Sequence, residues 1–397
     1  LNTSDSKFRL KLKGILMVSK NILYIGDPSS IHDFKWITFF SQKEEFNCFL
    51  IGEVNTCSKL SDEQEQTLAE HGIKLLPAIN DFSFSKPLAT IKAILRLRRI
   101  IKENEIDTVH ALFGSPQPIW FNFLAKGGKL IITNRGSDVL VLIKGLFESR
   151  KILLNNLLYK LIKRGFRKAN YVTCTSSKQI DYLRKDIVNS DVNLTLIKTG
   201  VDVRRIEKHS ERCELDLPLD KQLVFSIRYI GEVYNMDYQI AAIKQLPLDL
   251  KKSICFLFIK GGAVSEVFYD DFISKLEMID DFNYQIFDSL SQLEIWSLIK
   301  KSDLIYMVPK SDGTPNSALE TMASRKPFIM GDLDYNKELF DEVSLIAKLN
   351  SPKSLADNIA KGLLSYPINF LDNGFEKVTN FGSREAEMKK LLKLYTK

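Results

Sequence analysis

Short apolar runs alternate with helix-length segments along most of the chain. The first run is NILYIG, beginning at Asn21, and CFLIG, IKLLPA, DTVHALF, KLIITN, NYVTCT and LTLIK follow it. Between several of them, apolar residues recur every three or four positions, as in PLATIKAILRLRRIIKEN. The short runs predict buried strands, and the longer spacing predicts amphipathic helices. This alternation is typical of an α/β fold with a parallel sheet covered by helices on both faces.

The same alternation restarts in the second half of the chain. The runs LVFSIRYIG, SICFLFIKGG, NYQIFD, DLIYMVP and KPFIM predict a second parallel sheet. We therefore expect an N-terminal domain over 1–203, a polar linker over 204–222 and a C-terminal domain over 223–375. An amphipathic helix over 376–397 is expected to dock back on the body. Because ligands bind beyond the carboxyl ends of parallel strands, the expected site is a cleft shared by the domains.

Composition agrees with two globular domains. The chain has 397 residues, which is too long for a single hydrophobic core of ordinary size. Of these residues, 45% are hydrophobic and 26% are charged. Its five cysteines are scattered without a C-x-x-C pair, so neither a zinc site nor a disulfide framework is indicated, and a reducing compartment fits. The apolar core of the opening stretch, GILMV, is too short for a signal peptide, and no uncharged stretch suits a membrane span. These features favour a cytoplasmic protein.

The stretch SDGTPNSALETMASRKPFI carries the clearest candidate chemistry. Asp312 lies in a loop after a predicted strand, and Glu320 comes eight residues later, one turn into a predicted helix. Free N–H groups at a helix start bind anions such as a diphosphate, and the two carboxylates could bind the two ends of a nucleotide sugar. The alternative is an ordinary helix with two surface acids, capped by Asn316 or Ser317. The loop and helix-start candidates are Gly313, Thr314, Pro315, Asn316 and Ser317.

Further candidates follow other predicted strands. Lys310 and Lys260 should lie at strand ends, where each could meet a phosphate or simply be solvated. Gly136 could permit close approach of a ligand, and Asp138 could bind acceptor hydroxyls or cap the next helix. Gly26 stands where the first turn of a Rossmann-type domain needs a small residue, although GDPSS is not the dinucleotide fingerprint.

One motif could hold a metal ion. Asp332 and Asp334 form a D-x-D pair, which in metal-dependent transferases binds a divalent cation bridging the donor phosphates. The alternative is a loop without metal, and we expect no obligatory cofactor. A lone histidine such as His110 is expected to be structural.

Several stretches together resemble the family 4 glycosyltransferases, which have the GT-B fold of two Rossmann-like domains. SDGTPNSALETMASRKPFI resembles the family's acid-x7-acid signature, and LIITNRGSDVL resembles its T-x-H-G-x-D stretch. DTVHALFGSP, ANYVTCTSSKQIDYLRK, LIKTGVDVRR, LVFSIRYIGEVYNMDYQIAAI and GDLDYNKELF extend the resemblance across most of the chain. It implies a retaining transfer of a sugar from a nucleotide-sugar donor, without an obligatory metal. We expect the sugar to be of the hexose type and the acceptor to be a saccharide or lipid-linked, as in surface polysaccharide synthesis.

The resemblance also implies roles for single residues. Asp312 matches the acid that contacts donor-sugar hydroxyls, Glu320 the acid at the ribose, and Arg228 the arginine that binds the diphosphate. A guanidinium suits this last role because its fork pairs two oxygens and keeps its charge. Two positions depart from the pattern: the family's lysine five residues after the arginine is Val233, and its histidine is Arg135. A cation at Arg135 would suit an acidic sugar or an anionic acceptor, and the two changes leave open a homologue that binds but does not transfer.

The positive charge gathers in one segment. The net charge is +7, and Arg150–Lys168 holds seven basic residues and no acid. Leu154, Leu158, Leu161 and Ile162 would share one face of a helix there. A basic amphipathic helix is typical of contact with an anionic membrane surface, although its apolar face could equally pack in the core. Nucleic acid is not an expected partner, because no aromatic–basic interleaving or known binding module is present.

Overall fold

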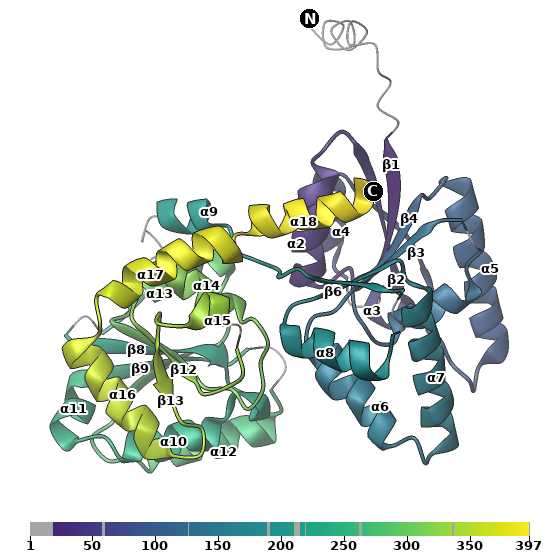
Figure 1. Cartoon of the computed structure of the whole chain (residues 1–397). Helices are drawn as coiled ribbons and strands as arrows, with labels where there is room; N and C mark the ends of the chain where they lie inside the picture. Colours follow the sequence, from purple (N-terminus) through teal and green to yellow (C-terminus); the bar gives the residue numbers. More distant parts are fainter. Residues whose placement is uncertain are drawn as a thin grey trace, which may run out of the picture. The chain divides into compact units, whose positions relative to one another are not determined.

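The computed structural model describes residues 19–57, 60–125, 127–188, 191–209, 215–218, 220–261, 264–335 and 337–396. The opening stretch GILMV and Cys213 lie outside these residues. The chain forms two compact units. Unit 1 comprises the residues up to Cys174 together with Ile180–Thr195, and unit 2 comprises Thr175–Gln179 and Leu196–Lys397. Each unit is a sheet covered by helices on both faces (Figure 1), as the alternating pattern predicted.

Unit 1 contains a seven-stranded sheet in the order β3-β2-β1-β4-β5-β6-β7. The strands confirm all seven predicted runs: β1 (Lys20–Ile25), β2 (Phe46–Glu53), β3 (Ile73–Ile79), β4 (Thr108–Ala111), β5 (Lys129–Thr133), β6 (Tyr171–Cys174) and β7 (Asn193–Leu196). The pairings from β3 through β6 are parallel. Pro77 is accommodated because β3 is an edge strand, where a missing N–H donor breaks no ladder. The strand order reverses between β1 and β4, so ligands are expected beyond the ends of these strands.

The helices of unit 1 connect these strands. They are α2 (Ile31–Ser41), α3 (Val54–Cys57), α4 (Asp62–Glu70), α5 (Pro87–Glu103), η1 (Gln117–Phe123), η2 (Asp138–Ile143), α6 (Lys144–Glu148), α7 (Leu153–Lys168) and α8 (Ser177–Asp186), whose first residues belong to unit 2. Helix α7 packs closely on η1, and the glycine at position 165 permits this contact. A methyl group on Gly165 would lie 2.0 Å from the carbonyl oxygen of Pro118 in η1.

Unit 2 contains a six-stranded parallel sheet in the order β10-β9-β8-β11-β12-β13. The five predicted runs form β8 (Gln222–Tyr229), β9 (Ile254–Ile259), β10 (Asn283–Phe287), β11 (Leu304–Met307) and β12 (Phe328–Gly331). The sequence pattern does not predict β13 (Leu345–Ala347), which has only three residues and exposes Ile346. Here the strand order reverses between β8 and β11.

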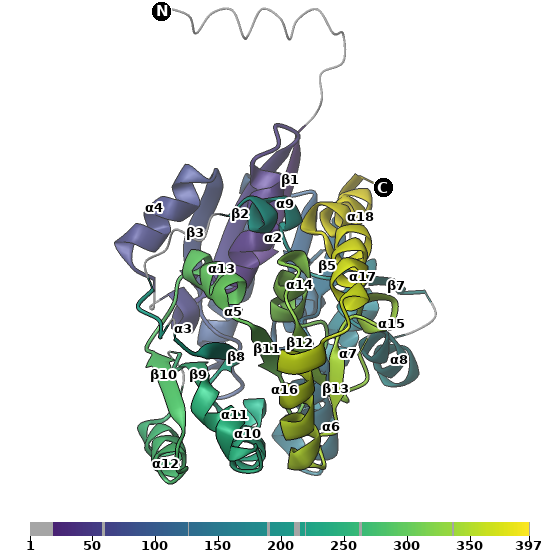
Figure 2. The ribbon, with the colours of Figure 1, turned by 90° about the vertical axis from the view of Figure 1, so that its left-hand side faces the viewer.

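Two apolar layers enclose the sheet of unit 2. One contains residues of α13 and α14, and the other contains residues of α10, α12 and α16. Figure 2 shows α10 and α16 side by side on the second face. The helices are α9 (Val203–Lys208), η3 (Glu232–Tyr234), α10 (Met236–Lys244), α11 (Leu248–Ser253), α12 (Glu266–Glu277), α13 (Gln292–Lys301), α14 (Asn316–Ala323), α15 (Lys337–Phe340), α16 (Pro352–Ser365), α17 (Asn369–Lys377), η4 (Val378–Gly382) and α18 (Arg384–Thr396).

The division of the chain differs from the expected one at the linker. The boundary falls after Thr195 rather than after residue 203, and the described part of 204–222 belongs to unit 2. Ile206 and Leu217 are buried in the core of that unit, which explains why this polar stretch does not behave as a free connector. The expected C-terminal helix is present as α18, and it also belongs to unit 2, where the buried Glu387 accepts a hydrogen bond from the backbone N–H of Lys198 at 2.8 Å.

Candidate active site

The predicted donor residues of unit 2 meet at the point where its strand order reverses. Arg228 is the penultimate residue of β8, and its Nη2 lies 2.9 Å from Oδ2 of Asp312 in the loop after β11. Its Nη1 donates to the Ser317 hydroxyl at 3.2 Å, and its guanidinium lies 4.8 Å from the ring centre of Tyr234. One cation therefore touches both the loop acid and the start of the following helix.

Helix α14 begins differently from the expectation. Pro315, rather than Asn316 or Ser317, occupies the N-cap position, and it makes no side-chain capping bond. Its φ of −70° suits that position, while the Ser317 hydroxyl is used by Arg228 instead. Because the first N–H groups of a helix have no partner within the helix, this start remains suited to an anion.

The loop before α14 is held by local hydrogen bonds. The N–H of Gly313 donates to Oδ1 of Asp312 at 2.8 Å, which fixes the carboxylate beside Arg228. The Thr314 hydroxyl donates to the carbonyl of Thr175, in the short segment that clusters with unit 2, at 2.8 Å. Asp312 therefore has a fixed orientation before any ligand arrives.

Glu320 lies one turn into α14 and is buried. Gln292 donates its side-chain amide to Oε1 of Glu320 at 3.1 Å, and Glu320 contributes to the electrostatic environment of Arg384. Burial lowers the pKa of Arg384, and the nearby Asp202 and Glu320 act in the opposite direction. Glu320 thus has protein partners already, and a ribose would have to share this carboxylate.

Tyr335 was not predicted from the sequence. Its hydroxyl is buried without a hydrogen-bond partner among the described residues. Burial raises the pKa of Tyr335, Asp312 raises it further, and Arg228 acts against them. The phenol therefore lies close enough to the Arg228–Asp312 pair to feel both charges. Tyr335 directly follows the D-x-D pair, and this position gave no signal of its own.

The two lysine candidates are placed differently. Lys260, after β9, has its Nζ 3.6 Å from Glu266 and 4.1 Å from the ring centre of Tyr269. Lys310 is exposed, and its backbone N–H donates to the carbonyl of Val233 at 2.8 Å. The backbone of Lys310 therefore lies next to Val233, the position at which the family that the sequence resembles has a lysine.

The D-x-D pair is partly engaged in the fold. Oδ1 of Asp332 accepts the backbone N–H of Leu349 at 2.8 Å, while Asp334 is exposed. Within the described residues, no group of three or more histidine, cysteine, aspartate or glutamate side chains is arranged to hold a metal ion.

Residues of unit 1 gather where the sheet order reverses between β1 and β4. Arg135, after β5, places Nη2 2.6 Å from Oδ1 of Asp33 on α2, and its Nε donates to the carbonyl of Leu112 at 3.3 Å. Burial raises the pKa of Asp33 to about 6, while Arg135 lowers it. Arg135 is thus already paired with an acid, which the sequence did not reveal. Gly26 is needed for this contact, because a methyl group there would lie 2.5 Å from Oδ2 of Asp33.

Asp138 holds the loop after β5 in place. Its carboxylate accepts the backbone N–H groups of Gly114, Arg135, Gly136 and Val139, at 2.7 to 3.1 Å. Of the two roles left open for Asp138, these contacts favour the structural one. Gly136 has a φ of +127°, a conformation that side chains rarely adopt, so glycine is required there for the backbone itself.

His110 is structural, as expected. It is fully buried, and its Nε2 lies 2.7 Å from the Thr133 hydroxyl. Burial lowers the pKa of His110 to about 3, and Arg135 contributes in the same direction. The imidazole is therefore neutral near pH 7.

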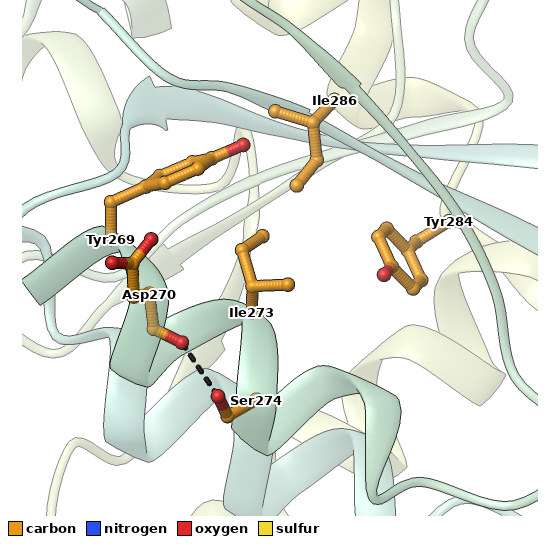
Figure 3. Close-up of a pocket in the computed structure, with 6 residues that line it drawn as sticks. All are labelled: Tyr269, Asp270, Ile273, Ser274, Tyr284 and Ile286. Carbon is orange, nitrogen blue, oxygen red and sulfur yellow. Dashed lines mark hydrogen bonds between the residues drawn. The ribbon is translucent and has the colours of Figure 1, made fainter. Parts of the chain in front are cut away.

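Unit 2 also has a cavity of about 410 Å³ between α12 and β10. Figure 3 shows Tyr269 and Tyr284 on opposite sides of this hollow, with Ile273 and Ile286 between them. None of the predicted donor residues lines it. The predicted site and this cavity are therefore separate features of unit 2.

Comparisons with known proteins agree with this arrangement. Residues 21–176 match the family model described as glycosyl transferase 4-like, and residues 207–373 match the model described as glycosyl transferases group 1. Among curated proteins, none matches the sequence. The two Rossmann-like units define a GT-B fold.

Solved structures share this fold across almost the whole chain. A glycosyltransferase from Rickettsia africae is 16% identical with a TM-score of 0.70, and the match covers 95% of this chain and 98% of that one. A sucrose-phosphate synthase from Thermosynechococcus elongatus is 15% identical with a TM-score of 0.72, over 95% and 98%. Anabaena HepE, solved with UDP, is 12% identical with a TM-score of 0.70, over 95% and 99%. The chain belongs to the family 4-like glycosyltransferases of the GT-B type.

Proposed function

We propose that this glycosyltransferase moves a hexose-type sugar from a nucleotide-sugar donor to a saccharide or lipid-linked acceptor, with retention of configuration. The observation that carries the proposal is the position of Arg228, which touches both Asp312 and the start of α14. A diphosphate at this point would meet a guanidinium and the free N–H groups of a helix start. Asp312 would then accept hydrogen bonds from the sugar hydroxyls, and Glu320 from the ribose.

The proposed reaction needs little acid–base machinery. The bond between the anomeric carbon and the phosphate oxygen breaks, and a bond to the acceptor oxygen forms on the same face. The acceptor proton passes to the departing phosphate oxygen, so the atoms balance without a protein nucleophile. Arg228 and the helix N–H groups stabilise the negative charge that develops on the leaving diphosphate.

Donor binding would change the contacts of Arg228. In the structure, one side of its guanidinium faces Asp312 and the other faces Ser317. A phosphate would share or replace the Ser317 contact, while Asp312 keeps the guanidinium oriented. The buried hydroxyl of Tyr335 lies near this pair and is a candidate donor to the same ligand.

We assign the missing lysine's charge to Lys310. Lys310 donates its backbone N–H to the carbonyl of Val233, which stands where the family has a lysine, and the side chain of Lys310 is exposed. Lys260 is a poorer substitute, because Glu266 and the Tyr269 ring already contact its ammonium group. Lys310→Ala should therefore weaken donor binding more than Lys260→Ala does.

The solved neighbours suggest where to begin. HepE was solved with UDP and with UDP-glucose, so uridine donors are the first to test. We also propose that the protein works in the cytoplasm, in surface polysaccharide synthesis and without an obligatory metal. Among the described residues, Cys48, Cys174 and Cys255 are buried thiols outside any disulfide, which fits a reducing compartment. Activity that is lost in chelator and restored by a divalent cation would instead favour a metal site at Asp332 and Asp334.

The deciding experiment measures donor binding and turnover together. A thermal-shift screen across nucleotide sugars should find a donor that raises the melting temperature, since a ligand that binds only the folded state stabilises it. Arg228→Ala and Glu320→Ala should lose that shift and the transfer or hydrolysis of the donor. Lys353→Ala removes an exposed cation of the same unit and is the matched control. Binding without turnover in the wild type would indicate a homologue that no longer transfers, and no binding at all would reject the site.

A further inference from the structure

An exposed apolar patch surrounds the start of α7 in unit 1. Ile152, Leu153 and Leu154 are consecutive and expose 58%, 71% and 56% of their surface. Leu157, one turn further, is also exposed, as are Val141 and Leu142 in η2. We call Ile152, Leu153, Leu154 and Leu157 the α7 patch. Single exposed apolar residues are ordinary, but a run of three at a helix start indicates an interaction site.

The orientation of α7 explains why these leucines face outward. The opposite side of the helix is held by the buried Ile162, Gly165 and Phe166, and Gly165 allows close contact with η1. The sequence predicts Leu154 and Ile162 on one helical face, which could meet a membrane or pack in the core. The structure buries Ile162 but leaves Leu154 exposed, so the helix does not use its whole apolar surface for the core.

Basic residues continue the same side of α7 beyond the patch. Leu153, Leu157, Lys160 and Arg164 recur at spacings of four and three, which places them on one face of the helix. All four are exposed. At a rise of about 1.5 Å per residue, Lys160 lies roughly 10 Å and Arg164 roughly 16 Å along the axis from Leu153. The helix therefore presents an apolar end followed by cations.

We propose that the α7 patch docks on an anionic bilayer surface. The leucines would enter the boundary between headgroups and acyl chains, about 5–10 Å deep, while Lys160 and nearby cations meet the lipid phosphates. Among the described residues, no helix has the length and apolar character of a membrane span. The inference is independent of the donor chemistry.

The charges favour lipid over a second copy of the chain. A symmetric dimer through this face would bring two identical basic stripes together, and like charges in contact are unfavourable. Arg150–Lys168 has no acid that could compensate for this repulsion. A soluble polyanion would satisfy the cations but would gain nothing from the leucines. An anionic membrane surface answers both features.

Vesicle flotation of the full chain tests the proposal. Vesicles of phosphatidylglycerol and phosphatidylcholine should carry the wild type upward at low salt, and vesicles of phosphatidylcholine alone should carry little. The double variant Leu153→Ser, Leu154→Ser should bind the anionic vesicles at least about tenfold more weakly, because each leucine contributes apolar transfer energy. Lys160→Glu should weaken binding about fivefold or more, and this loss should fade at high salt.

The matched control changes equally exposed apolar residues elsewhere. Leu364 and Ile368 of unit 2 expose 78% and 77% of their surface, and serine at both positions should leave flotation unchanged. Equal binding by the α7 variant and the wild type would overturn the proposal, as would a wild type that stays unbound. A concentration-dependent dimer abolished by the α7 variant, without flotation, would assign the patch to a second copy. Donor binding by the α7 variant should match the wild type, which separates this test from that of the proposed function.

Discussion

Replacing Glu387 by glutamine should destabilise unit 2 strongly. The Lys198 side chain is 2% exposed and its ammonium lies 3.8 Å from Oε1 of Glu387, whose side chain is 0% exposed. Lys198 also donates to the carbonyl of Phe381, and Lys390 pairs with the same carboxylate oxygen from the surface at 2.6 Å. Glutamine keeps the shape but removes the charge, so Lys198 is left as a buried cation. Breaking a buried pair costs about 3–5 kcal/mol, and the remaining Phe381 contact favours the lower end.

The assay is thermal unfolding monitored by calorimetry. A loss of about 3 kcal/mol should lower the melting temperature of unit 2 by roughly 6–12 °C, at 2–4 °C per kcal/mol for a unit of this size. Glu385→Gln is the matched control on the same helix, because its pair with Lys389 at 2.9 Å is exposed and should contribute less than about 1 kcal/mol. The double variant Lys198→Met, Glu387→Gln should recover most of the loss, since no buried charge remains.

The pH dependence gives an independent signature. Burial lowers the pKa of Lys198, and Glu387 acts in the opposite direction. Without Glu387 this pKa should fall further, so Lys198 loses its proton more readily in the folded variant. The deficit of Glu387→Gln relative to the wild type should therefore shrink as the pH rises from 7 toward 10. A deficit as small as that of Glu385→Gln, or one that is constant with pH, would refute the reasoning.

Three further predictions concern single residues of the two units. Burial lowers the pKa of His110 from 6.5 to about 3, so the unfolded chain takes up a proton first as the pH falls. The free energy of unfolding should therefore decrease by about 2 kcal/mol between pH 6.5 and pH 5. Urea unfolding of His110→Gln should show a smaller decrease over that interval. Gly26→Ala should destabilise unit 1 by about 1–3 kcal/mol because its methyl group would meet Asp33. Gly145→Ala, with open space around it in helix α6, should instead be stabilising by up to about 1 kcal/mol in the same urea assay. Arg228→Lys keeps the charge but loses the fork, and calorimetric titration and initial rates should show donor affinity at least about tenfold weaker and turnover about 10²-fold slower.

The sheets could be predicted because strands buried on both faces leave continuous apolar runs. Twelve of these runs predicted β1 to β12, whereas β13 has three residues and one exposed apolar side chain, too little for a pattern. The polar stretch 204–222, expected to be a linker, differs from that expectation for a related reason. Its polar composition concealed Ile206 and Leu217, single apolar residues whose burial depends on distant parts of unit 2.

The sequence predicts only those parts of the candidate site that neighbouring strands bring together. Arg228 lies at the end of β8 and Asp312 follows the adjacent β11, so the fold alone brings them together, as it does any residues at neighbouring strand ends. The partner of Arg135 is different. Asp33 stands 102 residues away on a helix, and nothing near either residue indicates the pair. The sequence alone therefore suggests that Arg135 could meet an acidic sugar or an anionic acceptor, whereas the fold already pairs it with an acid.

The two units contain the same kind of pair with different exposure and hydrogen bonding, and this difference predicts different behaviour toward an anion. In unit 1, Arg135 and Asp33 are 12% and 8% exposed at 2.6 Å, and Oδ2 of Asp33 also accepts the N–H of Asp27 at 2.9 Å. In unit 2, Arg228 and Asp312 are 23% and 15% exposed at 2.9 Å, and Oδ2 of Asp312 lacks an aligned hydrogen bond. A tightly bonded, less exposed pair resists exchange, whereas a looser pair can admit a competing anion. Unit 2 should therefore exchange its contacts with a donor phosphate, while the pair of unit 1 keeps its loops in place.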